Sequence, residues 1–400
     1  MKKSVSIIGG GSASLFLAAF LDSDLFEVTI FEKNKAPGRK FLVAGKGGFN
    51  LTHSELMDRF TDRYTPSSFL KEALLAFNND HLRKWLNEIG IPTYIGSSKR
   101  VFPEKGIKPI EVLKAILAVL KDKKVNFKFQ YEWTGWNEEN DLIFNTEIPV
   151  KSDFCVFSLG GASWKKTGSD GSWLNMFDSK GIETNPFQSA NCAFEIVWPS
   201  DFIAINEGRP LKNIAISCGS KTQKGEVVIT QFGLEGNAIY ALSPQIQEEL
   251  NIQKKAVIYI DLKPTLTVQA IRNRMNSSRE SKIGRLLHNV LKLSAAQINL
   301  LKSNLSKEEY LSLDILSNRI KNLSLTVTAA AALDDAISTS GGLDLEQVNK
   351  YFELKKMKNT YCIGEMLDWN APTGGYLLQA CFSMGVYLAH HLNQINQKNA

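Results

Sequence analysis

The sequence is poor in cysteine, and its five cysteines are scattered along 400 residues without a C-x-x-C pair. This distribution gives no support to a disulfide framework, a zinc site or a dithiol redox centre, and it is typical of a reducing compartment. Long apolar runs are also lacking, since none approaches the roughly 18 to 20 residues that span a bilayer. The amino-terminal apolar stretch imitates a secretory signal, but the glycines at positions 9–11 would break a signal helix. We therefore predict a soluble protein of the cytoplasm.

Neither sign of charge dominates the chain: 47 Lys and Arg against 41 Asp and Glu give a formal net charge of +6. This excess weakly favours an anionic ligand, but it does not separate a phosphate-bearing cofactor from nucleic acid or a membrane surface. With 44% hydrophobic and 22% charged residues, the chain is globular and long enough for two or three domains.

A βαβ unit is predicted in the stretch SVSIIGGGSASLFLAAFLDSDLFEVTIFEK, from Ser4 to Lys33. Three of residues 5–8, namely Val5, Ile7 and Ile8, are apolar and β-branched, as in a strand buried in a parallel sheet. Residues 13–21 have the pattern of a compact helix, and residues 27–31 have that of a second strand. The turn between the first strand and the helix reads G-x-G-x-x-S, so Ser14 replaces the third glycine of a dinucleotide fingerprint.

Each position of this fingerprint has a physical task. Gly9 permits the tight turn, Gly11 lets the backbone approach a pyrophosphate, and the third position needs a small residue, which Ser14 supplies. Glu32 follows 23 residues after Gly9, where a carboxylate accepts hydrogen bonds from the ribose hydroxyls of an adenosine. We therefore predict that an adenine dinucleotide binds here; the alternative is a glycine-rich turn in an enzyme that binds something else.

A second glycine-rich segment, APGRKFLVAGKGGFNLTHSE, covers residues 36–55 and has no acidic residue before its last position. Its glycines allow close backbone approach and its cations offset phosphate charge. The residues that suit a phosphate-rich ligand are the glycines Gly38, Gly45, Gly47 and Gly48 and the cations Arg39, Lys40 and Lys46. The segment lacks G-x-x-x-x-G-K-[ST], so it is not a triphosphate P-loop. The alternative is a flexible basic surface loop.

Two further segments decide between NAD and FAD. FCVFSLGGAS, residues 154–163, is an apolar strand that ends at a glycine pair beginning with Gly160. Residues 359–392 predict a strand, an acidic loop and then a long helix that begins near Gly374 and Gly375. The positive end of this helix suits a reduced flavin, and Glu365 or Asp368 suits ribityl hydroxyls. A simple NAD domain needs no such distant second unit, so the sequence favours FAD.

A family resemblance rests on motifs spread from Ser6 to Gln379, the most specific being GRKFLVAGKGGFNLTH and GEMLDWNAPTGGYLLQ. Together with IIGGGSAS, SSKRVFP, LGGASWKKTGSDG, TQFGLEGNAIYALSP and AISTSGGLDL, they resemble the BaiN-like (YhiN-type) NAD(P)/FAD-dependent oxidoreductases, some of which are named aminoacetone oxidases. The resemblance implies an α/β fold with a Rossmann-like FAD-binding domain of the two-dinucleotide-binding-fold type, built from both chain ends. A β-barrel-like insertion and a helical insertion lie between them.

The resemblance also implies which residues hold FAD. It places the pyrophosphate at Gly9, Gly11, Ser12 and Ala13, the adenosine ribose at Glu32 and Lys33, further cofactor contacts at Arg39, Lys40, Gly48, Asn50 and Leu51, and the ribityl chain and flavin near Gly364, Glu365, Asp368, Gly374, Gly375 and Tyr376. Two departures are Ser14 and AGKGGFN, where many members carry a cysteine in GRCN. The second departure argues against a thiol beside the flavin.

The strand and helix patterns support the insertions independently. Strand patterns dominate from 187 to about 262, and helical patterns follow, with capping-box spacings at Ser294 with Gln297 and at Ser306 with Glu309. We predict an FAD-binding domain from residues 1–186 and 325–400, a β-rich insert at 187–264 and a helical insert at 265–324.

A basic patch in the helical insert leaves a second function open. It comprises Arg272, Arg274, Arg279, Lys282 and Arg285, which could contact RNA as in RNA-modifying flavoproteins. We prefer a solvated helical face, because a single aromatic residue lies nearby to stack on bases. Nucleic acid is therefore not the expected partner. Of the histidines, His53 beside the glycine loop alone merits a test for chemistry.

The sequence thus predicts an FAD-dependent oxidoreductase that transfers hydride between the flavin and an unidentified small-molecule substrate. NAD(P)H is a possible transient donor, since a second G-x-G-x-x-G is missing. Alternatives are an RNA-modifying flavoprotein and a non-catalytic flavin-binding regulator. Catalytic side chains, a metal site and the oligomeric state are not indicated.

Overall fold

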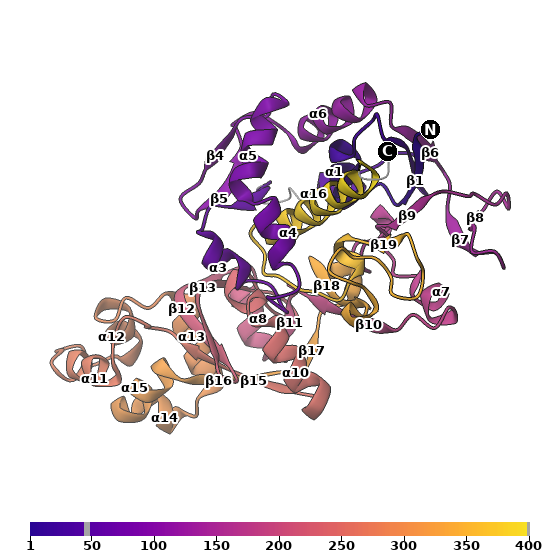
Figure 1. The fold of residues 1–400 in the computed structure, drawn as a ribbon. Coiled ribbons are helices and arrows are strands. Elements are labelled where there is room, and N and C mark those ends of the chain that lie inside the picture. The colour runs from indigo at the N-terminus through magenta and orange to yellow at the C-terminus, as the bar shows by residue number, and fades with distance from the viewer. Residues whose placement is uncertain (44–48, 398–400) are drawn as a thin grey trace. The chain divides into compact units, whose positions relative to one another are not determined.

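The computed structural model describes residues 1–43 and 49–397, which fall into two compact units (Figure 1). The first unit combines residues 1–188 with the residues from 338 onward, and the second comprises residues 189–337. Strands β10 (Thr184–Ala190) and β18 (Ser338–Leu343) pair with each other where the chain leaves the first unit and returns to it. The predicted β-rich and helical segments therefore lie mostly in the second unit.

The first unit is built on a five-stranded parallel sheet in the order β19-β9-β1-β2-β6. Its strands are β1 (Lys3–Ile8), β2 (Phe26–Glu32), β6 (Asn126–Phe129), β9 (Phe154–Phe157) and β19 (Thr360–Cys362). The apolar run in β1 is buried from Val5 to Ile8, as expected for a strand covered on both faces. The predicted strand-helix-strand unit is confirmed, and the carboxyl-terminal strand adds to the other edge of the same sheet.

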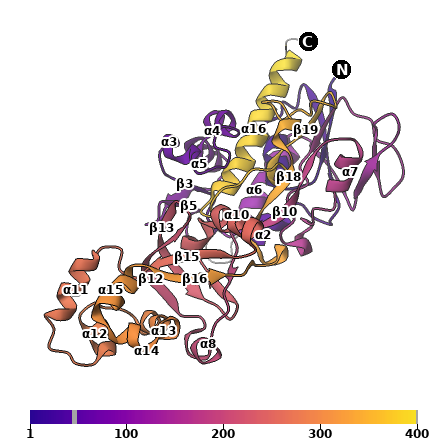
Figure 2. The ribbon, with the colours of Figure 1, turned by 90° about the horizontal axis from the view of Figure 1, so that it is seen from below.

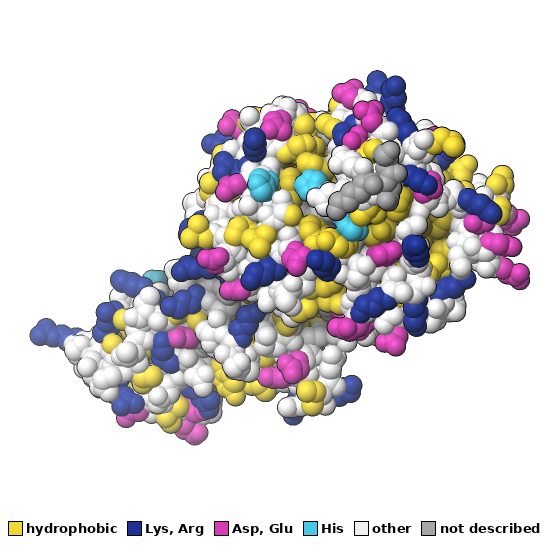
Figure 3. Space-filling model, viewed as in Figure 1, with side chains coloured by type: hydrophobic (Ala, Val, Ile, Leu, Met, Phe, Trp, Pro, Cys, Tyr) yellow, Lys and Arg dark blue, Asp and Glu magenta, His cyan; other side chains and the backbone are white. Residues whose placement is uncertain are grey.

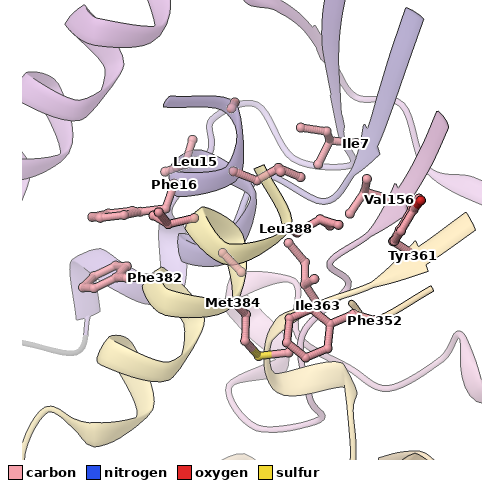
Figure 4. Packing of buried hydrophobic residues seen from close by; sticks show 14 of the residues in the cluster. Ile7, Leu15, Phe16, Val156, Phe352, Tyr361, Ile363, Phe382, Met384 and Leu388 are labelled. Carbon is pink, nitrogen blue, oxygen red and sulfur yellow. The ribbon is translucent and has the colours of Figure 1, made fainter. Parts of the chain in front are cut away.

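Two helices from opposite ends of the chain pack together against this sheet (Figure 4). They are α1 (Ser12–Phe20) and α16 (Tyr376–Gln397). The rings of Phe16 and Phe382 stack with their centroids 4.0 Å apart, and the fully buried Leu388 faces the sheet residues Ile7 and Val156. The amino-terminal fingerprint therefore cannot pack its core without the last helix of the chain.

Smaller elements complete the first unit. They are the antiparallel sheet β3-β5-β4 (Thr52–His53, Arg100–Pro103, Thr93–Ile95), the hairpin β7 (Trp133–Trp136) with β8 (Leu142–Phe144), and the helices α2 (Arg39–Val43), α3 (Met57–Thr61), α4 (Lys71–Ala76), α5 (Asn79–Glu88), α6 (Pro109–Asp122) and α7 (Leu174–Ser179). Short 3-10 turns lie at Lys165–Thr167, Leu345–Gln347 and Gly364–Met366.

The second unit contains a seven-stranded antiparallel sheet in the order β16-β15-β12-β13-β14-β11-β17 (Figure 2). The strands are β11 (Phe194–Glu195), β12 (Pro210–Cys218), β13 (Lys221–Ile229), β14 (Gly233–Glu235), β15 (Ala256–Asp261), β16 (Leu323–Val327) and β17 (Ala329–Ala330). Because Thr328 alone separates β16 from β17, the two end strands are tied together and the sheet must curl. This agrees with the barrel-like insertion that the family resemblance implies.

Helices of the second unit gather at one end of this sheet (Figure 2). They are α11 (Val268–Asn276), α12 (Ile283–Asn289), α13 (Ala295–Asn304), α14 (Lys307–Leu311) and α15 (Leu313–Lys321), while α8 (Ser200–Asn206), α9 (Asn237–Tyr240) and α10 (Ser243–Gln253) lie between the earlier strands and a 3-10 turn spans Leu333–Asp335. Both predicted capping boxes are confirmed, at Ser294 with Gln297 and at Ser306 with Glu309.

The hairpin between β12 and β13 is tight, because β13 already begins at Lys221 and Gly219 and Ser220 suffice for the turn. In the part of the chain that the structure describes, no helix has the length and apolar character needed to cross a membrane.

Candidate functional site

The carboxyl ends of four parallel strands meet at one edge of the five-stranded sheet. The Gly9 amide donates to the Phe31 carbonyl (2.8 Å), the Ser158 amide to the Ile8 carbonyl (2.8 Å), and the Ile363 amide to the Phe157 carbonyl (2.9 Å). The loops that follow β1, β2, β9 and β19 therefore leave the sheet side by side. In this way the fold brings Gly9, Glu32, Gly160 and Gly364 to one edge, where parallel α/β sheets bind their ligands.

The fingerprint turn is closed on one side and open on the other. Gly9 has φ +98°, and a Cβ there would lie 2.4 Å from the Ser158 carbonyl oxygen, so no other residue fits. A Cβ on Gly11 would meet no atom within 4 Å. Helix α1 begins immediately afterwards with Ser12 and Ala13, and its positive end faces the same place.

Ser14 fits the third fingerprint position for a reason visible in the structure. Its side chain is fully buried, and its hydroxyl donates a hydrogen bond to the Gly9 carbonyl oxygen. The serine thus ties the helix back to the turn, so the departure from glycine does not disturb the turn.

Glu32 stands at the end of β2 with its side chain buried beside the turn. One carboxylate oxygen accepts a hydrogen bond from the Gly10 amide (2.8 Å). The other accepts from the Asn34 amide (2.8 Å) and from the Asn34 side chain (2.7 Å). Each carboxylate oxygen can accept more than one hydrogen bond, so ribose hydroxyls can still be bound. Glu32 therefore also fixes the shape of the turn, a role that the sequence did not predict.

Two predicted basic residues lie at the border of this edge. The Lys33 ammonium pairs with Asp170 at 2.8 Å. Arg39 is exposed, and its guanidinium donates to the Asn34 side chain. Both residues are thereby linked to loops next to Glu32.

Lys40 connects three segments that are far apart in the sequence. Its ammonium pairs with Glu365 at 2.8 Å and donates to the Ser163 hydroxyl at 2.7 Å. The Gly38 amide donates to the Gly10 carbonyl at 2.8 Å, so the start of the second glycine-rich segment lies against the fingerprint. The structure thus brings Gly38, Lys40, Gly10 and Glu365 together.

Asp368 makes its hydrogen bonds to β10 and β18 and not to the fingerprint region. Its carboxylate accepts from the Asn185 side chain (2.9 Å) and from the Gly341 amide (2.7 Å), so it braces the β10–β18 pair. Between the two acidic residues proposed for ribityl hydroxyls, Glu365 is the one connected to the fingerprint region. Trp369 is buried, and its indole N–H donates to the Gly364 carbonyl (2.9 Å), which holds the intervening loop.

The glycine pair before α16 lies against the short strand β3. Gly375 has φ +99°, and a Cβ there would lie 2.6 Å from the Thr52 backbone. Leu51, just before this strand, is buried and its amide donates to the Val101 carbonyl (2.9 Å). Asn50 is half-buried next to it, whereas Gly48, like positions 45–47, lies outside the described residues. Gly374, Gly375 and Tyr376 thus meet the end of the second glycine-rich segment.

A charged cluster surrounds Tyr376 that sequence reasoning missed. The Tyr376 hydroxyl donates to Glu55, and Arg63 donates to both carboxylate oxygens of Glu55 (2.9 Å each). Burial raises the pKa of Tyr376, and Glu55 raises it further. Although burial alone would raise it, the pKa of Glu55 is lowered, because the bonds from Arg63 and Tyr376 outweigh desolvation. At neutral pH the tyrosine therefore keeps its proton.

His53 belongs to the same cluster. Its ring stacks on Tyr376 with centroids 5.2 Å apart, and its Nδ1 accepts from the Glu55 amide (3.1 Å). Burial lowers the pKa of His53 despite the neighbouring Glu55. The neutral ring is thus the stable form. Among the described residues, no group of His, Cys, Asp and Glu side chains is arranged to hold a metal ion.

The parallel sheet and its ligand edge define the class: a Rossmann-type fold of the kind found in FAD flavoproteins. The structure is similar to that of the open conformation of a flavocytochrome c3 fumarate reductase, with a TM-score of 0.52 and 11% sequence identity over 99% of this chain and 78% of that chain. The chain belongs to the family described as HI0933-like protein Rossmann domain, whose model matches residues 3–391. This confirms the family that the motifs predicted.

Three relatives span nearly the whole chain. A ribosomal RNA dihydrouridine synthase of Haemophilus influenzae is 25% identical, covering 94% of this chain and 95% of the relative. A 3-dehydro-bile acid delta(4,6)-reductase of Clostridium scindens is 25% identical, covering 96% and 97%. A ribosomal RNA dihydrouridine synthase of Escherichia coli is 22% identical, covering 94% of each.

Proposed function

We propose that this protein is an FAD-dependent oxidoreductase whose cofactor lies along the ligand edge of the five-stranded sheet. The observation that carries the proposal is a contrast between two glycines of the fingerprint turn. The Ser158 carbonyl leaves no room for a side chain at Gly9, whereas Gly11 faces open space at the start of a nine-residue helix. This is the shape that a pyrophosphate needs in order to reach backbone amides at the positive end of a helix. The residues present therefore fit the cofactor.

The remaining contacts follow from the order of the loops. Gly11, Ser12 and Ala13 would hold the pyrophosphate, and Glu32 would hold the adenosine ribose, with Lys33 beside it. Lys40, paired with Glu365, keeps the loops after β9 and β19 in place, which suits the ribityl side of the cofactor. The start of α16 at Gly374 to Tyr376 would face the flavin ring. When bound, FAD supplies hydride transfer between an electron donor and a substrate.

We further propose that the reaction is the reduction of a carbon–carbon double bond conjugated to a carbonyl group. The names of the relatives support this, because a dihydrouridine synthase and a delta(4,6)-reductase both reduce such a bond, one in uracil and one in a steroid. Overall, one hydride equivalent from the donor and one proton add across the double bond. NAD(P)H is the proposed donor; it binds transiently, since the chain has a single dinucleotide fingerprint.

Uridine in RNA is our first candidate for the substrate, because two of the three relatives carry that activity in their names. A small-molecule enone is the second candidate: the sequence predicted a small-molecule substrate without identifying it, and the bile acid reductase favours an enone. On this chain's side, the Glu55–Arg63–Tyr376 cluster fixes the start of α16 and keeps a protonated hydroxyl buried there.

The test is an anaerobic assay of the FAD-loaded protein with NADH or NADPH. One arm contains unmodified ribosomal RNA transcripts, with dihydrouridine measured by mass spectrometry of the nucleosides, and the other contains a 3-keto-4,6-diene steroid. Dihydrouridine formation confirms the first candidate, and steroid reduction with unchanged RNA confirms the second. A bound flavin that neither donor reduces would overturn the proposal in favour of a non-catalytic flavin-binding regulator.

A further inference from the structure

A basic pocket of about 450 Å³ opens on the second unit and is lined by residues of that unit, none of which is assigned to the cofactor. Its lining comes from the start of strand β12, from Lys263 after β15, and from the connection between α12 and α13 with the adjoining helix ends. Four of its lining side chains are Arg209, Lys212, Lys263 and Lys292, and no Asp or Glu is among the described residues that line it. Figure 3 shows several Lys and Arg side chains on the surface of the second unit.

The walls of this pocket are tied to one another. The Gln297 side-chain amide donates to the Lys212 carbonyl (3.2 Å), which joins α13 to β12. The Lys263 ammonium donates to the Lys292 carbonyl (3.1 Å), which joins the segment after β15 to the α12–α13 connection. The pocket is therefore formed by three segments in fixed contact.

Positive charge is concentrated in the segment that begins and ends with the pocket residues Lys263 and Lys292, and few of its cations form ion pairs. Between positions 263 and 292 the chain has seven basic residues (Lys263, Arg272, Arg274, Arg279, Lys282, Arg285 and Lys292) and one acidic residue, Glu280. Within the described part of the chain, Arg272 is the member of this set that forms an ion pair, with Asp314. The nearby Asp261 is already paired with Lys321 at 2.6 Å. Burial, together with Arg274, lowers the pKa of Lys263.

The amino-terminal end of α13 adds to the positive electrostatic potential of the pocket. The helix runs for ten residues from Ala295, and its capping box uses the amides of Ser294 and Gln297. Ala295 and Ala296, whose amides the box leaves free, line the pocket. Free first-turn amides attract anions in the same way as the neighbouring lysines do.

We propose that this pocket and the basic segment 272–285 bind the phosphate backbone of an RNA substrate. The proposal rests on the RNA-reductase function above and deepens it by naming where the polyanion is held. No Trp, Tyr or Phe is among the described residues that line the pocket, so it contacts phosphates and does not stack on bases. The second unit thus supplies affinity that is independent of sequence, while the choice of base belongs to the first unit.

The test compares a pocket variant with a matched control in the same unit. The pocket variant is Arg209→Gln, Lys212→Gln and Lys292→Gln, and the control is Lys224→Gln, Lys254→Gln and Lys255→Gln; all six side chains are exposed. Affinity for a ribosomal RNA transcript is measured by fluorescence anisotropy over a salt series. Because each phosphate contact releases counterions, the pocket variant should bind roughly 10- to 100-fold more weakly near 0.1 M salt. Its log–log salt slope should be shallower by about 2.

The control variant should change affinity by about twofold or less, and flavin reduction by NAD(P)H should be the same in all three proteins. If the wild-type protein reduces RNA but both variants bind it alike, the pocket proposal is wrong and the reductase proposal stands. If the wild type binds RNA through the pocket without reducing it, RNA is wrong as the reduced substrate, and the pocket stands as an RNA-binding site. Absence of RNA binding by the wild type overturns the pocket proposal. Should the triple variant misfold, Lys212→Gln alone gives the same comparison with a slope change of about 0.7.

Discussion

The two units differ in whether their positively charged side chains form ion pairs. Beside the ligand edge of the first unit, the cations are paired: Lys33 with Asp170, Lys40 with Glu365 and Arg63 with Glu55. In the second unit, most of the cations between 263 and 292 have no acidic partner among the described residues. The paired charges hold loops in place, whereas the unpaired charges remain available to a ligand.

This difference indicates two kinds of binding. In our proposals, a compact cofactor at the sheet edge is recognised by backbone shape and by a few buried polar atoms, which salt screens weakly. A long polyanion on the second unit is, in the same proposals, attracted by exposed charge, which salt screens strongly. The affinity for FAD should therefore vary little with salt, while the affinity for RNA should fall steeply. The predictions below test the first half of this comparison.

The largest effects are expected from a pair of glycine substitutions in the fingerprint turn. Gly9→Ala should destabilise the apo protein by about 2–5 kcal/mol, because it combines a positive φ with a clash against the Ser158 carbonyl. Gly11→Ala should leave the free energy of unfolding within about 1 kcal/mol of the wild type, since its Cβ meets no atom. It should instead weaken FAD binding by about 1–3 kcal/mol, or roughly 5- to 150-fold.

Chemical denaturation and fluorescence titration with FAD separate these two effects. A Gly11→Ala protein that binds FAD as tightly as the wild type would show that no pyrophosphate approaches this residue. The cofactor assignment would then lose the observation that carries it.

An effect smaller than that of Gly9→Ala is expected from Glu32→Gln, with Glu27→Gln, exposed on the same strand, as the control. The variant removes a charge that accepts hydrogen bonds from Gly10 and Asn34 and, in our proposal, from a ribose. We expect FAD affinity to fall by about 1.5–3 kcal/mol. FMN has no adenosine, so its affinity should change much less. Titrations of both proteins with FAD and FMN check this, and equal losses for the two flavins would remove Glu32 from the ribose site.

The sequence predicted the parts of this molecule that local signals determine. The apolar run at 5–8, the fingerprint turn and the capping residues Ser294 and Ser306 specify their own conformations, because a strand, a turn or a cap depends on neighbouring residues. The convergence of Gly9, Glu32, Gly160 and Gly364 was also predictable, since parallel strands end at one edge.

Long-range pairs could not be predicted in this way. Glu55 and Tyr376 are 321 positions apart, and nothing in either local motif indicates that a tyrosine hydroxyl meets that carboxylate. For the same reason, the sequence did not distinguish Glu365 from Asp368: both follow the last strand, but one meets Lys40 and the other meets Gly341.

The smallest expected effect concerns the pH dependence of stability at His53. Burial holds the pKa of the folded His53 below its ordinary value of 6.5, so the unfolded chain takes up a proton first as the pH falls. Stability that is fully present above about pH 7 should therefore decrease between about pH 7 and pH 5. His53→Gln keeps a hydrogen-bond acceptor for the Glu55 amide but does not titrate, so its free energy of unfolding should decrease less over this interval.

The comparison of the wild type with His53→Gln isolates the effect of His53, because the other titrating groups contribute equally to the pH dependence of both proteins. His390 and His391 also have pKa values lowered by burial, and they add the same pH dependence to both proteins. The pKa of Glu55 is also lowered, but its stabilising charge is lost only at pH values below its ordinary pKa of 4.5, which lie outside the interval tested. The difference between the two proteins in denaturation curves at pH 7.5, 6.5 and 5.5 thus reports the histidine alone. If the free energy of unfolding changes equally with pH in the wild type and in His53→Gln, the ring accepts a proton as easily in the folded cluster as in water. The paired charges around Tyr376 would then not exclude solvent, which would contradict our description of the first unit as a place of buried, paired charges.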